Sequence, residues 1–259
     1  MKSRILNKYQ QVLDRVEAAV NPPAGLIPLG TLDQGNIRYP LVKVTLGMGN
    51  AKRVLISAGI HGDEPAGVEA LCAFLERKLY APFLHKWEMH ILPCINPTGY
   101  EIGTRENHAG EDLNRQFKLD RPNVEVACVQ SVFETGPFDL DLELHEDVDS
   151  PGYYLYQKDL SPTLSDLGRR ILDAVEPVMP LDGSEEIEDM PADRGLLARL
   201  KPPDEMEWWP MALYAYKMQC RHMFTMETSC QFPMKQRVEA HLKAVETALS
   251  EFPGKPETV

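Results

Sequence analysis

The feature that most constrains the fold is the repeated alternation of strand-like and helix-like segments along the chain. Apolar runs or period-two alternation, typical of strands, occur at residues 41–46, 53–58, 89–95, 140–144, 153–156 and 222–226. Apolar residues at helical spacing occur at residues 4–20, 65–79, 123–133, 164–176 and 238–252. Strands separated by helices predict an α/β domain whose largely parallel or mixed sheet is covered on both faces. Segments 41–46 and 53–58 are also predicted to form a hairpin that leads into a central strand.

The chain is long enough to form one large domain without a disulfide or a structural metal. With 259 residues, 43% of them hydrophobic, it can bury well over half of the surface that its unfolded form exposes. We therefore predict a single domain over residues 1–259, in which a bound metal would serve chemistry. Residues 180–210 are acidic and proline-rich without a regular pattern, which indicates a long loop or lid, or else a rim that selects substrates. The acids at 182–189 suggest a cationic substrate group or simply a solubilising loop.

The charge balance argues against nucleic acid as a partner. The sequence has 27 Lys and Arg residues against 39 Asp and Glu residues, a net charge of −12, and no run of basic residues. No apolar stretch approaches the ~18 residues of a membrane helix, and the polar start of the chain lacks the apolar core of a secretory signal. Five cysteines without a CxxC pair are typical of reduced, buried thiols. These features predict a cytoplasmic protein without a nucleic-acid or membrane partner.

The strongest local motif is SAGIHGDEP at residues 57–65, where a predicted buried strand ends and a helix begins. Open α/β sheets bind ligands at such strand ends. His61 and Glu64 are three residues apart, a spacing that lets an imidazole and a carboxylate reach one cation from a tight turn. Gly59 and Gly62 are expected to permit unusual backbone angles there. Without further context, however, a His-x-x-Glu pair more often has a surface or capping role.

A second polar segment, residues 96–117, follows the next predicted strand. It contains Arg105, Asp112, Asn114 and Arg115. Arginine offers a planar fork of donors that stays charged at every working pH, so this group could bind a carboxylate or stabilise an oxyanion. Each arginine alone is more typical of a solvated or salt-bridged surface residue.

Two more polar residues end predicted strands further along the chain. His145 closes the alternating segment DLDLELH, and Glu227 follows the apolar run FTM 82 residues later. Considered separately, both are ordinary strand-end residues.

Taken in order, these four segments resemble the zinc carboxypeptidase superfamily, including its aspartoacylase and succinylglutamate desuccinylase branch. The resemblance spans residues 53–229 and rests on HGDE, on NPTGYEIGTRENHAGEDLNRQF, and on the LHED and METS strand ends. The long middle segment is similar to that of small bacterial murein peptide amidases. This resemblance implies a three-layer α/β domain with a mixed, mostly parallel sheet of about eight strands.

The resemblance also implies a metal site. His61, Glu64 and His145 correspond to the three zinc ligands of the superfamily, and the fourth position is left to water, as in catalytic zinc sites. Asp112 corresponds to the carboxylate that orients the first histidine. One zinc ion per chain is expected.

Four further residues receive catalytic or binding roles from the resemblance. Glu227 corresponds to the general base, which takes a proton from the zinc-activated water and later gives it to the departing amine. Arg105 corresponds to the arginine that polarises the scissile carbonyl and stabilises the oxyanion. Asn114 and Arg115 correspond to the pair that binds a substrate carboxylate.

Two departures from the superfamily pattern leave alternatives open. The carboxypeptidases carry a mobile tyrosine well upstream of the base, whereas Tyr214 and Tyr216 stand only 13 and 11 residues before Glu227, so either could take that role or both could simply pack. His145 is followed by Glu146 and Asp147, where a small or polar residue is usual. These acids fit a solvated loop, or alternatively a second metal ion beside the first.

The sequence thus predicts a zinc-dependent hydrolase that cleaves an amide bond next to a free carboxylate, as a carboxypeptidase or peptide amidase does. The alternative is an aspartoacylase-like enzyme that deacylates small N-acyl amino acids with the same residues. Few residues follow Glu227, which favours the compact peptidase because the deacylase branch usually appends a further domain. A silent peptide-binding protein is disfavoured because every ligand and the base have a candidate.

Overall fold

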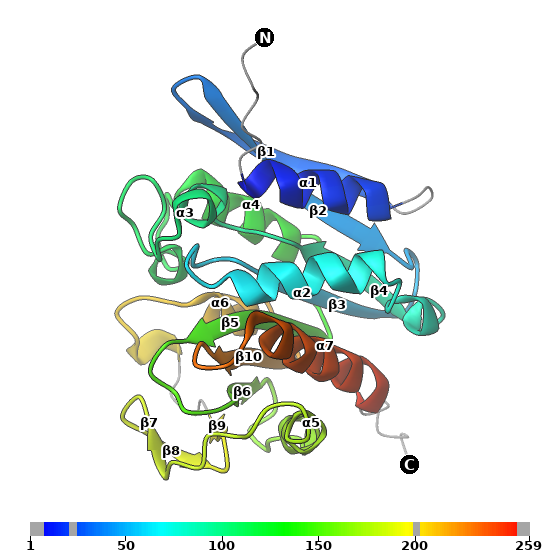
Figure 1. Cartoon of the computed structure of the whole chain (residues 1–259), viewed down its shortest axis with the longest axis vertical. Helices are drawn as coiled ribbons and strands as arrows, with labels where there is room; N and C mark the ends of the chain where they lie inside the picture. The colour runs from blue at the N-terminus through cyan, green and yellow to red at the C-terminus, as the bar shows by residue number, and fades with distance from the viewer. Residues whose placement is uncertain (1–7, 21–24, 199–202, 253–259) are drawn as a thin grey trace.

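A ten-stranded mixed sheet runs through the computed structural model, which describes residues 8–20, 25–198 and 203–252 (Figure 1). The strands are β1 (Gly25–Gln34), β2 (Ile37–Leu46), β3 (Lys52–Ala58), β4 (Trp87–Leu92), β5 (Leu140–Asp147), β6 (Tyr154–Asp159), β7 (Glu186–Ile187), β8 (Met190–Asp193), β9 (Leu196–Ala198) and β10 (His222–Ser229). Their order across the sheet is β1-β2-β4-β3-β5-β10-β6-β9-β8-β7. The neighbours β4, β3, β5 and β10 are parallel, so their carboxyl ends meet at one edge.

Helices cover both faces of this sheet (Figure 1). One face is covered by α1 (Lys8–Ala19), α2 (Pro65–Glu76), α5 (Leu167–Val175) and α7 (Met234–Glu251). The other face is covered by α4 (Val124–Phe133) and α6 (Met211–Lys217), whose apolar residues share one cluster. The short helix α3 (Pro97–Ile102) packs against α1 and β2. The predicted three-layer α/β domain is therefore confirmed.

The sheet differs from the expectation in strand number and direction. It has ten strands instead of about eight, and parallel pairing is confined to the central strands and the β6–β9 pair. The additional strands come from β1, which pairs with β2, and from the short strands β7–β9 inside the predicted loop at 180–210. Strands of two to four residues are too short to show a period in the sequence.

The predicted hairpin between segments 41–46 and 53–58 is wrong. Strand β2 pairs with β1 and β4, and β4 separates it from β3. Because Val54, Leu55 and Ile56 are fully buried, β3 needs covered neighbours on both sides, and the α2 crossover supplies β4 as a parallel partner. A sequence-adjacent antiparallel strand would not provide that arrangement.

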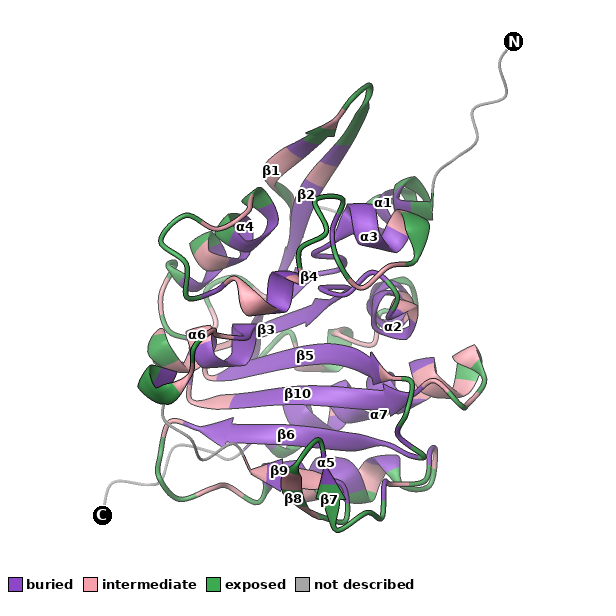
Figure 2. Cartoon of the chain, turned by 90° about the vertical axis from the view of Figure 1, so that its left-hand side faces the viewer, coloured by how far each residue is buried: buried purple, intermediate pink, exposed green. Residues whose placement is uncertain are grey.

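Strand β5 shows how the sequence separates the core from the polar face. Leu140, Leu142 and Leu144 belong to the larger hydrophobic cluster beneath α2 and α7. Because side chains alternate along a strand, Asp141 and Glu143 point to the opposite face, which α6 covers. Figure 2 shows β5 and β10 buried along most of their length. The polar side of β5 is therefore enclosed by protein up to the strand end.

Some sequence-based predictions concern residues that the structure does not describe. These are residues 4–7 of the predicted first helix and residues 199–202 of the predicted loop. Among the described residues, no helix combines the length and apolar character needed to cross a bilayer.

A buried charge cluster on β3 and β4 makes stability depend on pH. Glu88 Oε1 accepts hydrogen bonds from Arg53 Nε at 3.1 Å and from His90 Nε2 at 2.9 Å. Burial lowers the pKa of His90 to about 4, and Lys43 and Arg53 add to the effect. An unfolded histidine has a pKa near 6.5, so the native state favours the neutral ring. This contribution to stability is complete above about pH 6.5 and is lost as the pH falls toward about 4.

We expect the free energy of unfolding to fall over this window, with a His90 contribution on the order of 2 kcal/mol. In a His90→Gln variant, the fall between pH 6.5 and pH 4 should be shallower by that amount. Urea denaturation at a series of pH values measures it. His85→Gln, at an exposed position, is the control. Equal slopes for wild type and His90→Gln would contradict the prediction.

Candidate active site

The first two predicted metal ligands lie on the turn that follows β3. His61 and Glu64 are buried, and His61 Nδ1 lies 2.6 Å from Glu64 Oε1. Gly59 adopts a left-handed φ of 63°. Gly62 does not, and is needed for a different reason: a Cβ there would lie 1.9 Å from the carbonyl carbon of Gly99. The ligand turn thus packs backbone against backbone on α3.

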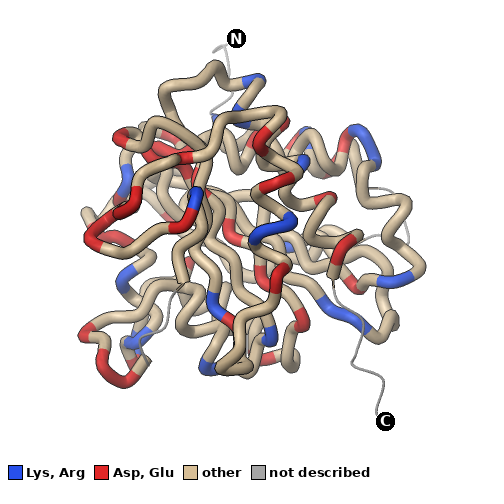
Figure 3. Tube along the Cα trace, turned by 90° about the horizontal axis from the view of Figure 1, so that it is seen from below, with Lys and Arg blue, Asp and Glu red and all other residues tan. Residues whose placement is uncertain are grey.

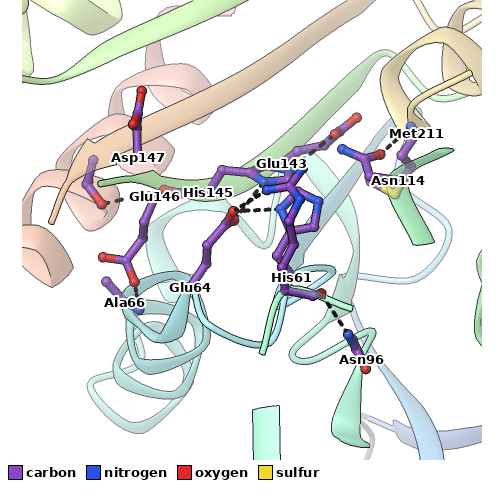
Figure 4. A network of polar contacts seen from close by, with 12 residues as sticks. His61, Glu64, Ala66, Asn96, Asn114, Glu143, His145, Glu146, Asp147 and Met211 are labelled. Atoms are coloured by element: carbon purple, nitrogen blue, oxygen red, sulfur yellow. Dashed lines mark hydrogen bonds and ion pairs between the residues drawn. The ribbon is translucent and has the colours of Figure 1, made fainter. Parts of the chain in front are cut away.

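His145 at the end of β5 completes the cluster (Figure 4). Its Nδ1 lies 2.8 Å from Glu64 Oε2, and its ring centroid is 5.0 Å from that of His61. In the part of the chain that the structure describes, these three residues are the one group of His, Cys, Asp or Glu placed to share a metal ion, with ligand atoms within 4.8 Å of one another. Two imidazole nitrogens and a carboxylate oxygen that face a common point fit a divalent metal ion.

Each histidine has a carboxylate behind its other ring nitrogen. His61 Nε2 lies 3.3 Å from Asp112 Oδ1, and His145 Nε2 lies 3.6 Å from Glu143 Oε2. A carboxylate on this side favours a proton on the outer nitrogen, which leaves Nδ1 for a metal. Sequence reasoning identified Asp112 but missed Glu143. The available signal was its spacing, since Glu143 precedes His145 by two residues and shares its face of β5.

The charges of the cluster keep its carboxylates ionised. Burial alone would raise the pKa of Glu64, but His61 and His145 hold it well below the usual range. Burial also opposes ionisation of Asp112, and its contacts with His61 and Arg105 overcome that effect and lower its pKa. Ionised carboxylates beside two imidazoles are the electrostatic setting that a cation requires.

Glu227 lies beside His145 because β10 pairs with β5 in parallel. Its side chain is nearly buried but reaches the cavity in front of the cluster. Burial raises the pKa of Glu227 to about 8, against the opposing pull of His145. A carboxyl with a pKa near neutrality is suited to accept and return a proton.

Arg105 faces the cavity from the segment that follows α3. Its Nε donates to Asp112 Oδ2 at 3.0 Å, and its Nη1 lies 3.6 Å from Glu64 Oε1. The side chain is 38% exposed, so it keeps donors toward the cavity. A guanidinium in this position can stabilise negative charge that develops beside the metal site.

Asn114 and Arg115 belong to the 3-10 turn η2 (Leu113–Arg115). Asn114 Oδ1 accepts a hydrogen bond from the backbone N–H of Met211 at 2.8 Å (Figure 4). The Arg115 guanidinium stacks over the ring of Trp208, 3.8 Å from the ring centroid. Both side chains line the same cavity as Arg105.

One cavity of about 330 Å³ joins most of the predicted site residues. Seven of the eight line it: His61, Glu64, Arg105, Asn114, Arg115, His145 and Glu227. Asp112 does not line it but contacts His61 and Arg105 from behind.

The tyrosines of the cavity are not the two that the sequence suggested. Tyr214 packs against Phe117 and Phe133, at centroid distances of 5.8 and 5.7 Å, and does not line the cavity. The cavity is instead lined by Tyr154 and Tyr156 of β6. Sequence reasoning missed both because β6 follows β5 in the chain, far from Glu227, and reaches it only by pairing with β10.

Of the acids after His145, two have structural partners. Glu146 accepts a hydrogen bond from the backbone N–H of Ala66 at the start of α2 and forms an ion pair with Arg237 of α7. Asp147 accepts hydrogen bonds from the Tyr154 hydroxyl and from the backbone N–H of Asp149, both at 2.8 Å. These contacts tie the strand end to its surroundings and give both carboxylates a structural role.

Comparison with known proteins places this site in a family. The sequence profile of the succinylglutamate desuccinylase/aspartoacylase catalytic domain matches residues 50–249, which include every site residue described above. The chain belongs to this family. The resemblance to the zinc carboxypeptidase superfamily inferred from the motifs is thereby confirmed.

This member of the desuccinylase/aspartoacylase family also has curated relatives among peptide hydrolases. It is 36% identical to murein peptide amidase A of Escherichia coli K12 over 95 residues, which are 36% of this chain and 38% of that protein. It is 30% identical to carboxypeptidase D of Anas platyrhynchos over 131 residues, which are 38% of this chain and 9% of that protein. The matched regions thus span less than half the length of these relatives.

Solved structures with the same fold cover nearly the whole family member. A candidate metallopeptidase from Shewanella amazonensis SB2B superposes with a TM-score of 0.78 at 24% identity, covering 94% of this chain and 91% of that one. A metallo-carboxypeptidase from Burkholderia cenocepacia gives a TM-score of 0.67 at 19% identity, covering 93% and 67% of the two chains. These likenesses establish a carboxypeptidase-like fold.

Proposed function

We propose that this chain is a zinc-dependent hydrolase that cleaves an amide bond adjacent to a free carboxylate, as a metallocarboxypeptidase or peptide amidase does. The observation that carries the proposal is the single cavity that joins a His-Glu-His cluster, a buried carboxyl and two arginines. Two histidines and one carboxylate with an open fourth position are the donor set of catalytic zinc. One zinc ion per chain is expected.

The residues of the cavity divide the chemistry among them. Zinc held by His61, Glu64 and His145 would supply an activated water and a positive charge for the substrate carbonyl. Glu227 takes a proton from the water and returns it to the departing amine. Arg105 donates to the oxygen that becomes negative when the carbonyl carbon is attacked.

Asn114 and Arg115 would bind the carboxylate of the released residue. A guanidinium can offer two parallel N–H donors to one carboxylate, and the Asn114 amide adds a donor because its oxygen already accepts from Met211. The free carboxylate would therefore be the group by which the enzyme recognises its substrate. The distance from the bound carboxylate to Glu227 would determine which bond is cleaved.

Replacing Arg115 by Met tests this role. We expect the KM for free-carboxylate substrates to rise by about 10- to 100-fold, because a hydrogen bond to a charged group contributes about 1.5–3 kcal/mol. The turnover number should change little. Steady-state kinetics on free-carboxylate substrates measures both, and Arg121→Met, at an exposed position, is the control. A normal KM in the Arg115 variant would remove the residue from the carboxylate site.

A second candidate function is deacylation of small N-acyl amino acids. The family profile over residues 50–249 favours it, because succinylglutamate desuccinylase and aspartoacylase give the family its description. The same Arg105, Asn114 and Arg115 would then hold the amino-acid carboxylate, while a small acyl group takes the place of the peptide.

One experiment separates these functions. The zinc-loaded protein is incubated with free-carboxylate peptides, their amidated counterparts, γ-linked murein-type peptides and N-acyl amino acids, and new species are identified by mass spectrometry. Release of a terminal residue from peptides supports the peptidase. Exclusive loss of acyl groups from N-acyl amino acids supports the deacylase. Binding of a peptide without any product would point to a silent binding protein.

A further inference from the structure

The segment that leads into α6 contacts both Asn114 and Arg115, the two residues proposed to bind the substrate carboxylate. Residues 203–211, here called the strap, run from the 3-10 turn η3 (Pro203–Glu205) to the first residue of α6. Within it, Trp208 lies under the guanidinium of Arg115, and the Met211 N–H donates to Asn114. The strap therefore contacts two adjacent binding residues through one side chain and one backbone group.

The strap is held by a hydrogen bond within it and by contacts with the rest of the domain. Trp209 Nε1 donates to the carbonyl of Pro203 at 2.9 Å, and Lys118 Nζ donates to the carbonyl of Met206 at 2.5 Å. Trp209 also packs on the apolar cluster beneath α4 and α6. Trp208 is the member of the Trp pair that turns toward the site, although it does not line the cavity. Its effect on a substrate must therefore pass through Arg115.

Stacking has a defined consequence for a guanidinium. The five N–H donors of arginine lie in the plane of the group, so an aromatic ring under one face leaves the donor edges available to a carboxylate. The ring also restricts a side chain that is otherwise flexible, and less freedom is then lost when the substrate binds. Arg115 is 38% exposed, its Nη1 donates to the carbonyl oxygen of Asn114 at 3.2 Å, and the ring of Trp208 adds a contact with the face of the guanidinium.

We propose that Trp208 is a positioning residue for carboxylate recognition: it holds the Arg115 guanidinium in the orientation that binds the carboxylate of the substrate. This inference rests on the proposed role of Arg115 in the hydrolase. It assigns a function to part of the 180–210 region, which the sequence indicated to be either a loop or a substrate-selective rim.

Substitutions at Trp208 give the first test. In Trp208→Leu the KM for free-carboxylate substrates should rise about tenfold, with the turnover number within about twofold of wild type, because the loss is one of binding. Trp208→Phe should restore most of the affinity because it keeps an aromatic face. Glu207→Ala, at an exposed position of the same strap, is the control. A fall in turnover number at unchanged KM, or no recovery in Trp208→Phe, would overturn the proposal.

A double-mutant cycle tests whether Trp208 acts through Arg115. In an Arg115→Met background, Trp208→Leu should raise the KM by less than about twofold, because the guanidinium that it positions is gone. A full tenfold effect in that background would show a contribution independent of Arg115, and would overturn the proposal.

Equilibrium binding keeps this test separate from the hydrolase proposal. If wild type hydrolyses nothing in the substrate pool, the hydrolase proposal fails, and binding of the same free-carboxylate compounds and their amides is measured by calorimetry. A tenfold weaker affinity of Trp208→Leu for the carboxylates alone supports the positioning role. Equal affinities, or no carboxylate binding by wild type, overturn it.

Discussion

Replacing Glu227 by Gln is expected to lower the turnover number by at least about 10³-fold while the protein retains its full metal content, because Gln fills the same space but cannot take up a proton. Glu227 is adjacent to His145 in the sheet but outside the three-residue donor cluster, so the metal site should persist. The loss should appear in the turnover number at nearly unchanged KM. Steady-state kinetics and metal analysis of the same preparation measure both.

Glu185→Gln provides the control for this substitution. It makes the same chemical change at an exposed position outside the cavity, and should leave activity and metal content as in wild type. Full hydrolytic activity in Glu227→Gln would exclude the residue as the base. Loss of metal in the same variant would instead place Glu227 among the groups that hold the ion.

The second large effect is expected from His145→Ala. His61 and His145 each contact one oxygen of Glu64. Without His145, only His61 and Glu64 remain as metal ligands, which are too few to bind an ion tightly. Loss of a residue that only hydrogen-bonds to a metal ligand typically weakens metal binding by roughly 10- to 100-fold. Loss of the ligand His145 itself should weaken it further, and hydrolysis should disappear with the metal. Metal content after dialysis, followed by thermal unfolding with and without added zinc, gives the measurement.

His85→Ala is the matched control, because His85 is exposed and lies outside the cavity. In wild type and in this control, added zinc should raise the unfolding temperature, since an ion that binds only the native state stabilises it. In His145→Ala the shift should be absent. A normal metal content in His145→Ala would show that the cluster is not the metal site.

Much of the site could be predicted because its residues stand at the ends of recognisable strands. In β5 the alternating leucines pack on the core, and His145 stands on the opposite side of the strand. The resemblance to the zinc carboxypeptidase superfamily grouped His61, His145 and Glu227, and the structure shows the physical basis: parallel strands bring their carboxyl ends to one edge of the sheet.

The features that escaped prediction depend on packing between elements. Glu143 shares the face of His145, but its role follows from the orientation of the imidazole ring, which no periodicity records. Trp208 lies in a region without a regular pattern, and its stacking on Arg115 joins segments that are distant in the chain. The hairpin of β1 with β2 was missed because Gly25, Pro28 and Gly30 interrupt the apolar residues of β1, a composition more typical of a connection than of a strand.

The contact between Gly62 and Gly99 has a consequence for how such a protein can evolve. The turn that bears His61 and Glu64 packs on α3, which the segment of Arg105 follows, and a side chain at residue 62 would overlap the main chain of residues 99 and 100. A larger residue at position 62 would therefore require α3 to move away, and that movement would shift the Arg105 segment relative to the residues of the His-Glu-His cluster. The turn at residues 61–64 and the helix α3 are thus expected to evolve together: residues of the cavity wall can vary, but the distance between these two backbones cannot.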